Sequence, residues 1–172
     1  MVRVSEDADD QQRASRVFRV YLAANQGAEM AQEREQLQAV VHGPLKELCR
    51  QHAWDVSVVD LRRNEIDSSD PRLLNTCMQG IESCRLGAYV SFLGEKYGHV
   101  LTRVPEESVA CLDHKPWLAS IRNRCLPEAQ SKGMAAGLLE LEATAAFLLA
   151  PSELPGSRFY LRRWKCLASR LI

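Results

Sequence analysis

Two glutamates, Glu140 and Glu142, lie at the start of a segment that is otherwise apolar. The segment is expected to form a helix from about Gly137 to Leu149, and residues two apart on a helix point to different faces. One glutamate is therefore expected to face solvent and the other the interior. A carboxylate in a partly apolar cleft can stabilise an oxocarbenium-like positive charge. The alternative is that acidic residues in a first helical turn simply favour the helix dipole.

Six cysteines are scattered through apolar segments: Cys49, Cys77, Cys84, Cys111, Cys125 and Cys166. The acidic, polar stretch from Met1 to Asp10 is unlike a secretory signal peptide, so reduced and mostly buried thiols are expected rather than a disulfide framework. Two pairs, Cys49 with His52 and Cys111 with His114, have a Cys-x2-His spacing that a zinc site can use. Each pair lacks the glycine-rich knuckle usual in such sites. Core thiols remain the preferred interpretation, and no metal is expected.

Composition and missing motifs exclude several classes of function. The 22 basic and 22 acidic side chains give a net charge of +0, without the basic excess of a nucleic-acid binder. No apolar run approaches the roughly 18 residues needed to span a bilayer, so no membrane partner and a cytoplasmic location are expected. The glycine-rich loops of nucleotide-triphosphate and dinucleotide sites are absent, as is the G-x-S-x-G nucleophile elbow. ATP hydrolysis, hydride transfer and acyl transfer are therefore disfavoured.

Strand and helix patterns alternate along the chain. Strands are expected at 17–23, 55–61, 88–93 and 158–162, and helices at 28–52, 71–84 and 137–149, with a short helix at 117–124. The alternation implies right-handed crossovers and an α/β fold with a parallel sheet of about four strands and helices on both faces. Residues 1–15 are expected to be a disordered acidic tail, and residues 16–172 a single domain.

The first predicted helix carries one apolar stripe: Met30, Leu37, Val41, Leu45 and Leu48. Pro44 is expected to kink or divide this helix. The charged run from Glu33 to Glu35 is interpreted as a solvated helix face.

In an open parallel sheet, ligands bind outside the carboxyl ends of the strands, near the point where the strand order reverses. The expected strand ends lead into residues 24–27, 62–67 and 94–98. Any active site should therefore be sought at these segments. Together with the paired carboxylates, this gives the candidate ligand-binding residues Ala24, Asn25, Arg62, Gly94 and Glu140.

Several stretches, taken in order, resemble one known family. They are Val20–Asn25, Glu29–Arg34 ("D-M-x-x-E-R"), Val41–Cys49 ("V-F-P-x-L-x-x-x-C"), Val58–Arg62 ("V-D-L-R-W-G"), Phe92–Gly98 ("L-L-G-E-R-Y-G"), Leu139–Glu142 ("T-E-x-E") and Arg158–Arg162 ("F-F-Y-F-R"). The chain resembles the Toll/interleukin-receptor-like domain of unknown function found ahead of NACHT-type ATPase modules. The telomerase-associated WD-repeat protein, the NACHT and WD-repeat proteins and a nephrocystin carry this domain.

The resemblance covers roughly residues 17 to 163 and implies a flavodoxin-like, Toll/interleukin-receptor-like sheet in a cytosolic signalling or scaffold protein. It implies an N-terminal protein-interaction and regulatory domain, or a short product of such a gene, with protein partners, homo-oligomers included, and no cofactor. Some relatives of this fold hydrolyse NAD with a glutamate on the helix after the third strand. By motif position Glu142 would be the catalytic residue of such an NAD glycohydrolase, assisting nicotinamide release from NAD as substrate.

The sequence also departs from the family pattern at the strand ends. Arg63-Asn64 replaces the Trp-Gly after the second strand, and Leu139 replaces the threonine before the paired glutamates. Ala23-Ala24-Asn25 replaces Ser-Ser-Thr after the first strand. Because each change lies where a ligand would bind, turnover is disfavoured relative to binding. Members of the family continue with another strand and helix, so we expect the sheet to be truncated, with its fourth strand at an exposed edge or covered by Trp164–Ile172.

Overall fold

A computed structural model shows how the strands and helices are arranged. It describes residues 16–25, 30–61, 70, 72–85, 87–94, 98–101, 104, 106–110, 112–113, 118–126, 129, 132–133, 136–153 and 158–161. The predicted acidic tail of residues 1–15 and the predicted covering segment Trp164–Ile172 lie outside these ranges.

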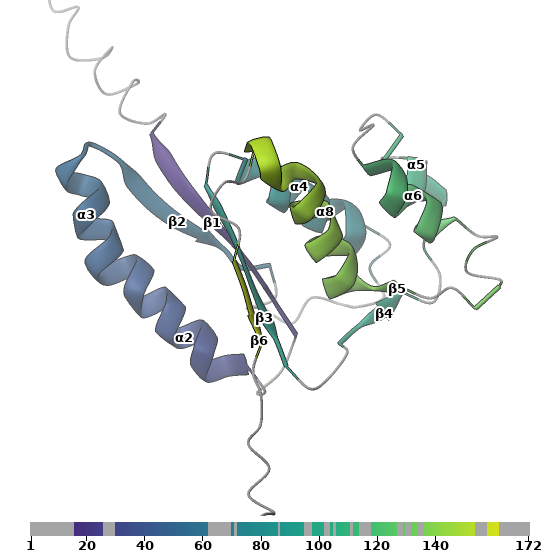
Figure 1. The fold of residues 1–172 in the computed structure, drawn as a ribbon, viewed down its shortest axis with the longest axis horizontal. Coiled ribbons are helices and arrows are strands. Elements are labelled where there is room, and N and C mark those ends of the chain that lie inside the picture. Colours follow the sequence, from purple (N-terminus) through teal and green to yellow (C-terminus); the bar gives the residue numbers. More distant parts are fainter. Residues whose placement is uncertain are drawn as a thin grey trace, which may run out of the picture.

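A parallel sheet forms the centre of the fold (Figure 1). Its strands are β1 (Val17–Ala24), β2 (Asp55–Val59), β3 (Ala88–Leu93) and β6 (Arg158–Leu161), and their order is β2-β1-β3-β6. The predicted α/β class, with about four parallel strands in a flavodoxin-like arrangement, is confirmed. Two further short strands, β4 (Val100–Leu101) and β5 (Ala136–Gly137), pair antiparallel beside it and were not predicted.

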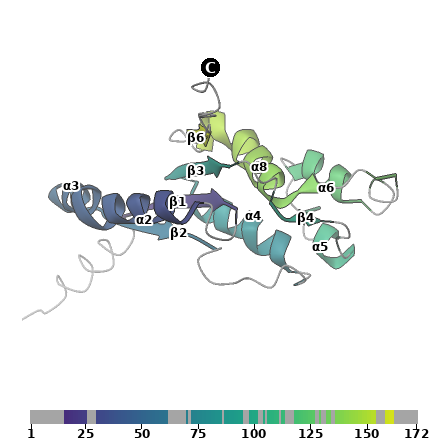
Figure 2. The same cartoon turned by 90° about the horizontal axis from the view of Figure 1, so that it is seen from below.

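Helices cover both faces of the sheet, as predicted (Figures 1 and 2). On one face lie α2 (Ala31–Val40), the π-helical turn η2 (Val41–Leu45) and α3 (Lys46–Gln51). On the other face lie α4 (Leu73–Ser83) and α8 (Leu138–Glu153), with the shorter helices α5 (Glu106–Ala110) and α6 (Ala119–Cys125) farther from the sheet. Within the described ranges, no helix is both long enough and apolar enough to cross a bilayer.

The first helix is divided at Pro44, as its sequence predicts. Gly43 leaves helical geometry (φ −101°, ψ −106°), and the turn around it contains an extra residue. The extra residue changes which side chains face the sheet beyond this point. Cys49 packs against the core, while Leu48, predicted to belong to the buried stripe, is 53% exposed.

The second amphipathic helix, α4, agrees with its pattern. Its predicted apolar positions are all buried: Leu73, Leu74, Cys77, Met78, Ile81 and Cys84. The helix begins at Leu73 rather than at Pro71, because Asp70 closes a turn just before it. The Asp70 carboxylate accepts a hydrogen bond of 2.8 Å from the backbone N–H of Arg72. The backbone carbonyl of Asp70 accepts one of 3.0 Å from the backbone N–H of Leu73.

The last helix, α8, is longer than expected. It runs to Glu153, through Pro151, whereas the sequence pattern predicts an end at Leu149 and a turn from Pro151. A proline removes one backbone hydrogen bond, which a helix tolerates near its end, and α8 stops two residues later.

Candidate functional site

The strand order reverses between β1 and β3. The chain leaves β1 for β2 on one side and then crosses to β3 on the other, so the ends of β1 and β3 lie side by side, with Ala24 paired to Phe92. Three of the predicted ligand-binding residues, Ala24, Asn25 and Gly94, follow or complete these two strands. The fold therefore brings these three residues to adjacent strand ends, and ligand binding by them stays a prediction.

Asn25, at the end of β1, lies close to Gly98, a neighbour that the sequence did not predict. Asn25 is buried, and a Cβ atom on Gly98 would overlap its side-chain oxygen Oδ1. Gly98 also has φ +86°, a backbone conformation that favours glycine. The chain's own Asn25 and Gly98 thus lie against each other at the point where the strand order reverses.

Gly98→Ala is expected to destabilise the protein by about 1–3 kcal/mol, because the new methyl group meets Asn25 and the backbone conformation becomes strained. Gly43→Ala is the matched control, since a Cβ there meets nothing within 4 Å. Urea unfolding of both variants measures the difference. Equal effects at the two positions would show that the contact with Asn25 is unimportant.

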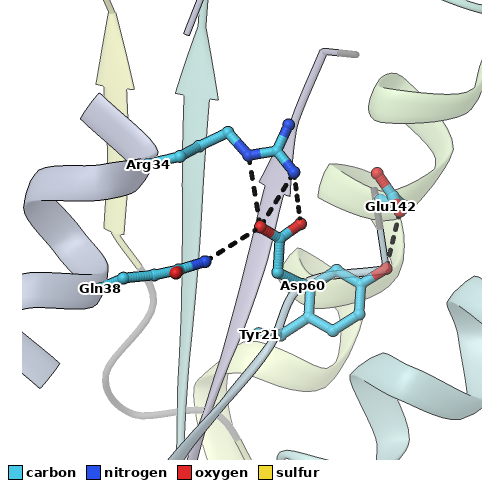
Figure 3. Close-up of polar contacts among 5 residues, drawn as sticks. All are labelled: Tyr21, Arg34, Gln38, Asp60 and Glu142. Carbon is cyan, nitrogen blue, oxygen red and sulfur yellow. Dashed lines mark hydrogen bonds and ion pairs between the residues drawn. The ribbon is translucent and has the colours of Figure 1, made fainter. Parts of the chain in front are cut away.

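Glu142 points into the interior and is held by Tyr21 (Figure 3). The Tyr21 hydroxyl donates a hydrogen bond of 2.7 Å to Glu142 Oε1, joining β1 to α8, and Glu142 is 1% exposed. Tyr21 also stacks on Tyr89 of β3, its partner in register, with the ring centroids 5.8 Å apart and the planes at 7°. Glu142 is therefore part of the packed layer between the sheet and its helices.

Glu140 faces the opposite way. Its side chain is partly exposed and forms an ion pair with Arg124 of α6, Oε1 to Nη2 2.7 Å. The prediction that one glutamate of the pair faces solvent and the other the interior is confirmed. Glu140 ties α8 to α6 rather than joining the contact between Glu142 and Tyr21.

Gly80 of α4 makes room for the Tyr21 ring. A Cβ atom at Gly80 would lie 2.7 Å from Cε2 of Tyr21 and 3.2 Å from Cδ1 of Leu61. Glycine inside a helix costs about 1 kcal/mol relative to alanine, and here it lets the helix lie close to the aromatic ring. Tyr21 is thus fixed by β3, α4 and α8 together.

A second buried carboxylate, Asp60, lies at the end of β2 and is bound by Arg34 of α2 (Figure 3). Arg34 Nη2 lies 2.8 Å from Oδ1 and 2.9 Å from Oδ2, and Nε lies 3.3 Å from Oδ2. Gln38 Nε2 adds a longer contact of 3.5 Å. The side chains of Arg34 and Asp60 are 11% and 5% exposed. This bidentate pair fixes α2 to the end of its neighbouring strand.

The interpretation of Glu33–Glu35 as a solvated face is wrong for Arg34. Position 34 lies between Met30 and Leu37 of the apolar stripe, so it faces the sheet. The sequence did contain a signal for this. Met30 and Leu37 are seven residues, or two helical turns, apart, so the residue between them at position 34 lies on the same inward face.

Exposed apolar side chains gather on the α2–α3 layer. The described residues include four exposed large apolar side chains: Val40 (51%), Leu48 (53%), Trp54 (38%) and Phe147 (68%). Three of the four belong to α2, α3 or the turn after α3. We call Val40, Pro44 and Leu48, all exposed and spaced four residues apart, the α2–α3 ridge.

The described cysteines are free thiols, as predicted. Cys77, Cys84 and Cys125 are buried, Cys49 is partly buried, and no group of three His, Cys, Asp or Glu side chains in the described ranges could hold a metal. The predicted zinc pair Cys111 and His114 lies outside those ranges. Burial raises the pKa of the Cys84 thiol, and it raises that of Cys125 to about 11.

Cys125 is expected to resist alkylation in the folded protein at pH 8. With a pKa raised to about 11, only roughly a thousandth of this thiol is thiolate at that pH. Brief iodoacetamide treatment followed by peptide mass spectrometry should label the partly buried Cys49 before Cys125, and Cys125 only after unfolding. Native labelling of Cys125 at the rate of Cys49 would contradict this expectation.

The candidate site is thus made of contacts within the chain. Tyr21 binds one buried carboxylate, Arg34 binds the other, and Asn25 lies against Gly98. The remaining predicted ligand-binding residue, Arg62, lies outside the described ranges. A scan against models of protein families, a search of curated proteins and a search of solved structures each found no match to this chain.

Proposed function

We propose that this chain is a cytoplasmic protein-interaction and regulatory domain of a NACHT-type signalling protein, or a short product of such a gene. The family resemblance supplies the signalling context. The observation that carries the interaction role is the gathering of exposed apolar side chains on the α2–α3 layer.

The exposed apolar side chains lie on the outer side of the α2–α3 layer, where a partner could contact them. Met30, at the N-terminal end of α2, and Val41 of η2 are each 1% exposed and already belong to the core. Val40 and Leu48 are on the outer side and are about half exposed, so these two side chains are available to a partner. Full burial of one such side chain contributes roughly 1.5–3 kcal/mol, and a few anchors of this kind account for most of the affinity of an interface.

The surroundings of Glu142 support binding rather than turnover. A carboxylate that assists bond cleavage must come within hydrogen-bond reach of its substrate. Glu142 is 1% exposed, and its Oε1 atom accepts the hydroxyl of Tyr21. The simplest role for this carboxylate is to join α8 to β1.

Partner capture tests the proposal. The full chain, tagged and expressed in cells, is cross-linked and its partners are identified by mass spectrometry. Val40→Asp and Leu48→Asp should each lose the captured partner, whereas Phe147→Asp, an exposed apolar residue on the other face, should keep it. Identical capture by all three variants would overturn a binding role for the α2–α3 ridge.

NAD glycohydrolase activity is the second candidate, and it rests on the motif position of Glu142, which the family resemblance makes the catalytic residue. Purified protein is incubated with NAD, and nicotinamide is measured by chromatography, with Glu142→Gln as the control. We expect equal traces from both proteins. Release that depends on Glu142 would replace the interaction role with an enzymatic one.

A further inference from the structure

We infer that Pro44 decides which side chain of α3 faces the core, Cys49 or Leu48, and thereby whether the α2–α3 ridge exists. The apolar pattern of the sequence fits one register of α3 against the sheet, and the structure has another. The inference concerns the surface on which the proposed function depends, and its consequence for binding rests on that function.

A regular α-helix through this segment would place Leu48 against the core. Val41 is 1% exposed and belongs to the core beneath the helix. Leu48 follows Val41 by seven residues. At about 3.6 residues per turn it would lie within about 20° of Val41 around the axis, whereas Cys49 would lie about 80° away. The regular register would therefore bury Leu48 and leave Cys49 at the side of the helix.

The structure has the other register. The backbone N–H of Lys46 donates to the carbonyl oxygen of Val41, five residues earlier, instead of four residues earlier as in a regular α-helix. This wider turn holds one extra residue, so every later position is rotated back by about 100°. Cys49 then packs against the core in place of Leu48, and Leu48 is 53% exposed.

Pro44 explains the wider turn. In a regular helix, residue 44 donates its N–H to the carbonyl oxygen of Val40, but proline has no N–H and its ring collides with that carbonyl. The burial of a leucine in place of the smaller cysteine opposes the wider turn, because more apolar surface leaves water. The cost of a proline inside a regular helix and the gain from burying one leucine are of comparable size. One substitution at Pro44 is therefore enough to exchange the two registers.

Apart from Cys49, few contacts hold α3 in its present register. All six residues of α3 are described, and none of them is buried. Its contact with β2, from Lys46 Nζ to Asp55 Oδ1, is 3.9 Å long, and the side chain of Asp55 is mostly exposed. A rotation of α3 would therefore exchange Leu48 for Cys49 and disturb little else.

Two variants of the full chain that differ by one residue test the inference. Pro44→Ala removes the proline and keeps the number of residues, so α3 should move to the regular register. The same substitution combined with deletion of Gly43 also removes the extra residue. Cys49 then follows Val41 by seven positions and stays inward in a regular helix. The comparison separates a change of register from the simple loss of the wider turn.

Thiol labelling and thermal unfolding report the register. Iodoacetamide should label Cys49 several-fold faster in Pro44→Ala than in the wild type, and at the wild-type rate in the deletion variant. Leu48→Ala should lower the melting temperature by less than about 2 °C in the wild type, where the side chain is exposed. In Pro44→Ala, where Leu48 is buried, the same change should lower it by about 5 °C or more.

Four outcomes would overturn the inference. The first three are unchanged labelling of Cys49 in Pro44→Ala, an equal effect of Leu48→Ala with and without Pro44, and identical behaviour of Pro44→Ala and the deletion variant. The fourth is a Pro44→Ala chain that circular dichroism shows to be unfolded, because the regular register would then not be a stable alternative.

Partner capture connects the register to the proposed function. Pro44→Ala should lose the captured partner, as Leu48→Asp does, because both remove Leu48 from the surface. If the register shifts as expected but both variants keep the partner, the inference about Pro44 stands and the proposed role of the ridge is wrong. If Leu48→Asp loses the partner while Cys49 labelling in Pro44→Ala stays as in the wild type, the interaction role stands and Pro44 does not set the register.

Discussion

Replacing Arg34 with methionine is expected to lower the free energy of unfolding by about 3–5 kcal/mol. The substitution keeps most of the side-chain volume but removes the guanidinium that binds Asp60 through two nitrogens. Asp60 then stays 5% exposed and keeps its 3.5 Å contact with Gln38, but it has lost the guanidinium. A buried carboxylate without its cation is costly because the interior solvates charge poorly.

Two further variants separate this effect from simple loss of an arginine. Arg50→Met removes an exposed arginine from the neighbouring helix α3 and should change stability by less than about 0.5 kcal/mol. Arg34→Met combined with Asp60→Leu removes both charges and should recover much of the loss, as replacement of buried ion pairs by apolar residues often does. Urea unfolding at pH 7 measures all three. If Arg34→Met and Arg50→Met had equal effects, the buried pair would not hold α2 against β2.

The parallel sheet and its main helices could be predicted because their patterns are local. The apolar residues of α4 recur every three or four positions, as on one face of a helix. The strands β1 and β3 are short apolar runs bounded by polar or glycine residues. Gly87 marks the start of β3 for a physical reason as well, since a Cβ atom there would overlap the carbonyl oxygen of Arg19. The opposite orientations of Glu140 and Glu142 likewise followed from their spacing alone.

The contacts that build the candidate site depend on distant residues and could not be predicted in this way. Tyr21 and Glu142 are 121 positions apart, and Arg34 and Asp60 are 26 apart. The sequence around Tyr21 or Arg34 does not specify which distant residue each will contact. The order of the strands in the sheet brings the partners together. The exposure of Leu48 could not be predicted either, because it depends on the extra residue in the π-helical turn at Pro44. That residue turns Leu48 outward and so creates the α2–α3 ridge. The family resemblance itself, and the function that it implies, stay predictions.

Glu142→Ala is expected to lower the free energy of unfolding by about 2–4 kcal/mol. The change removes the carboxylate oxygen that accepts the hydroxyl of Tyr21 and opens a space under α8. Glu140→Ala, two residues away on the same helix, is the matched control. It removes a partly exposed ion pair to Arg124 and should cost less than about 1 kcal/mol. Chemical unfolding of the two variants gives the comparison directly.

A double-mutant cycle with Tyr21→Phe assigns the loss to the hydrogen bond. Tyr21→Phe alone should cost about 1–3 kcal/mol, and in the Glu142→Ala background it should cost much less, because the partner is already gone.

The sign of the stability change caused by Glu142→Ala also bears on function. Carboxylates kept in an interior for catalysis are often destabilising, so that their removal stabilises the protein. A stabilised Glu142→Ala variant would therefore favour the enzymatic alternative, whereas the expected loss of stability identifies Glu142 as the residue that holds α8 on the sheet.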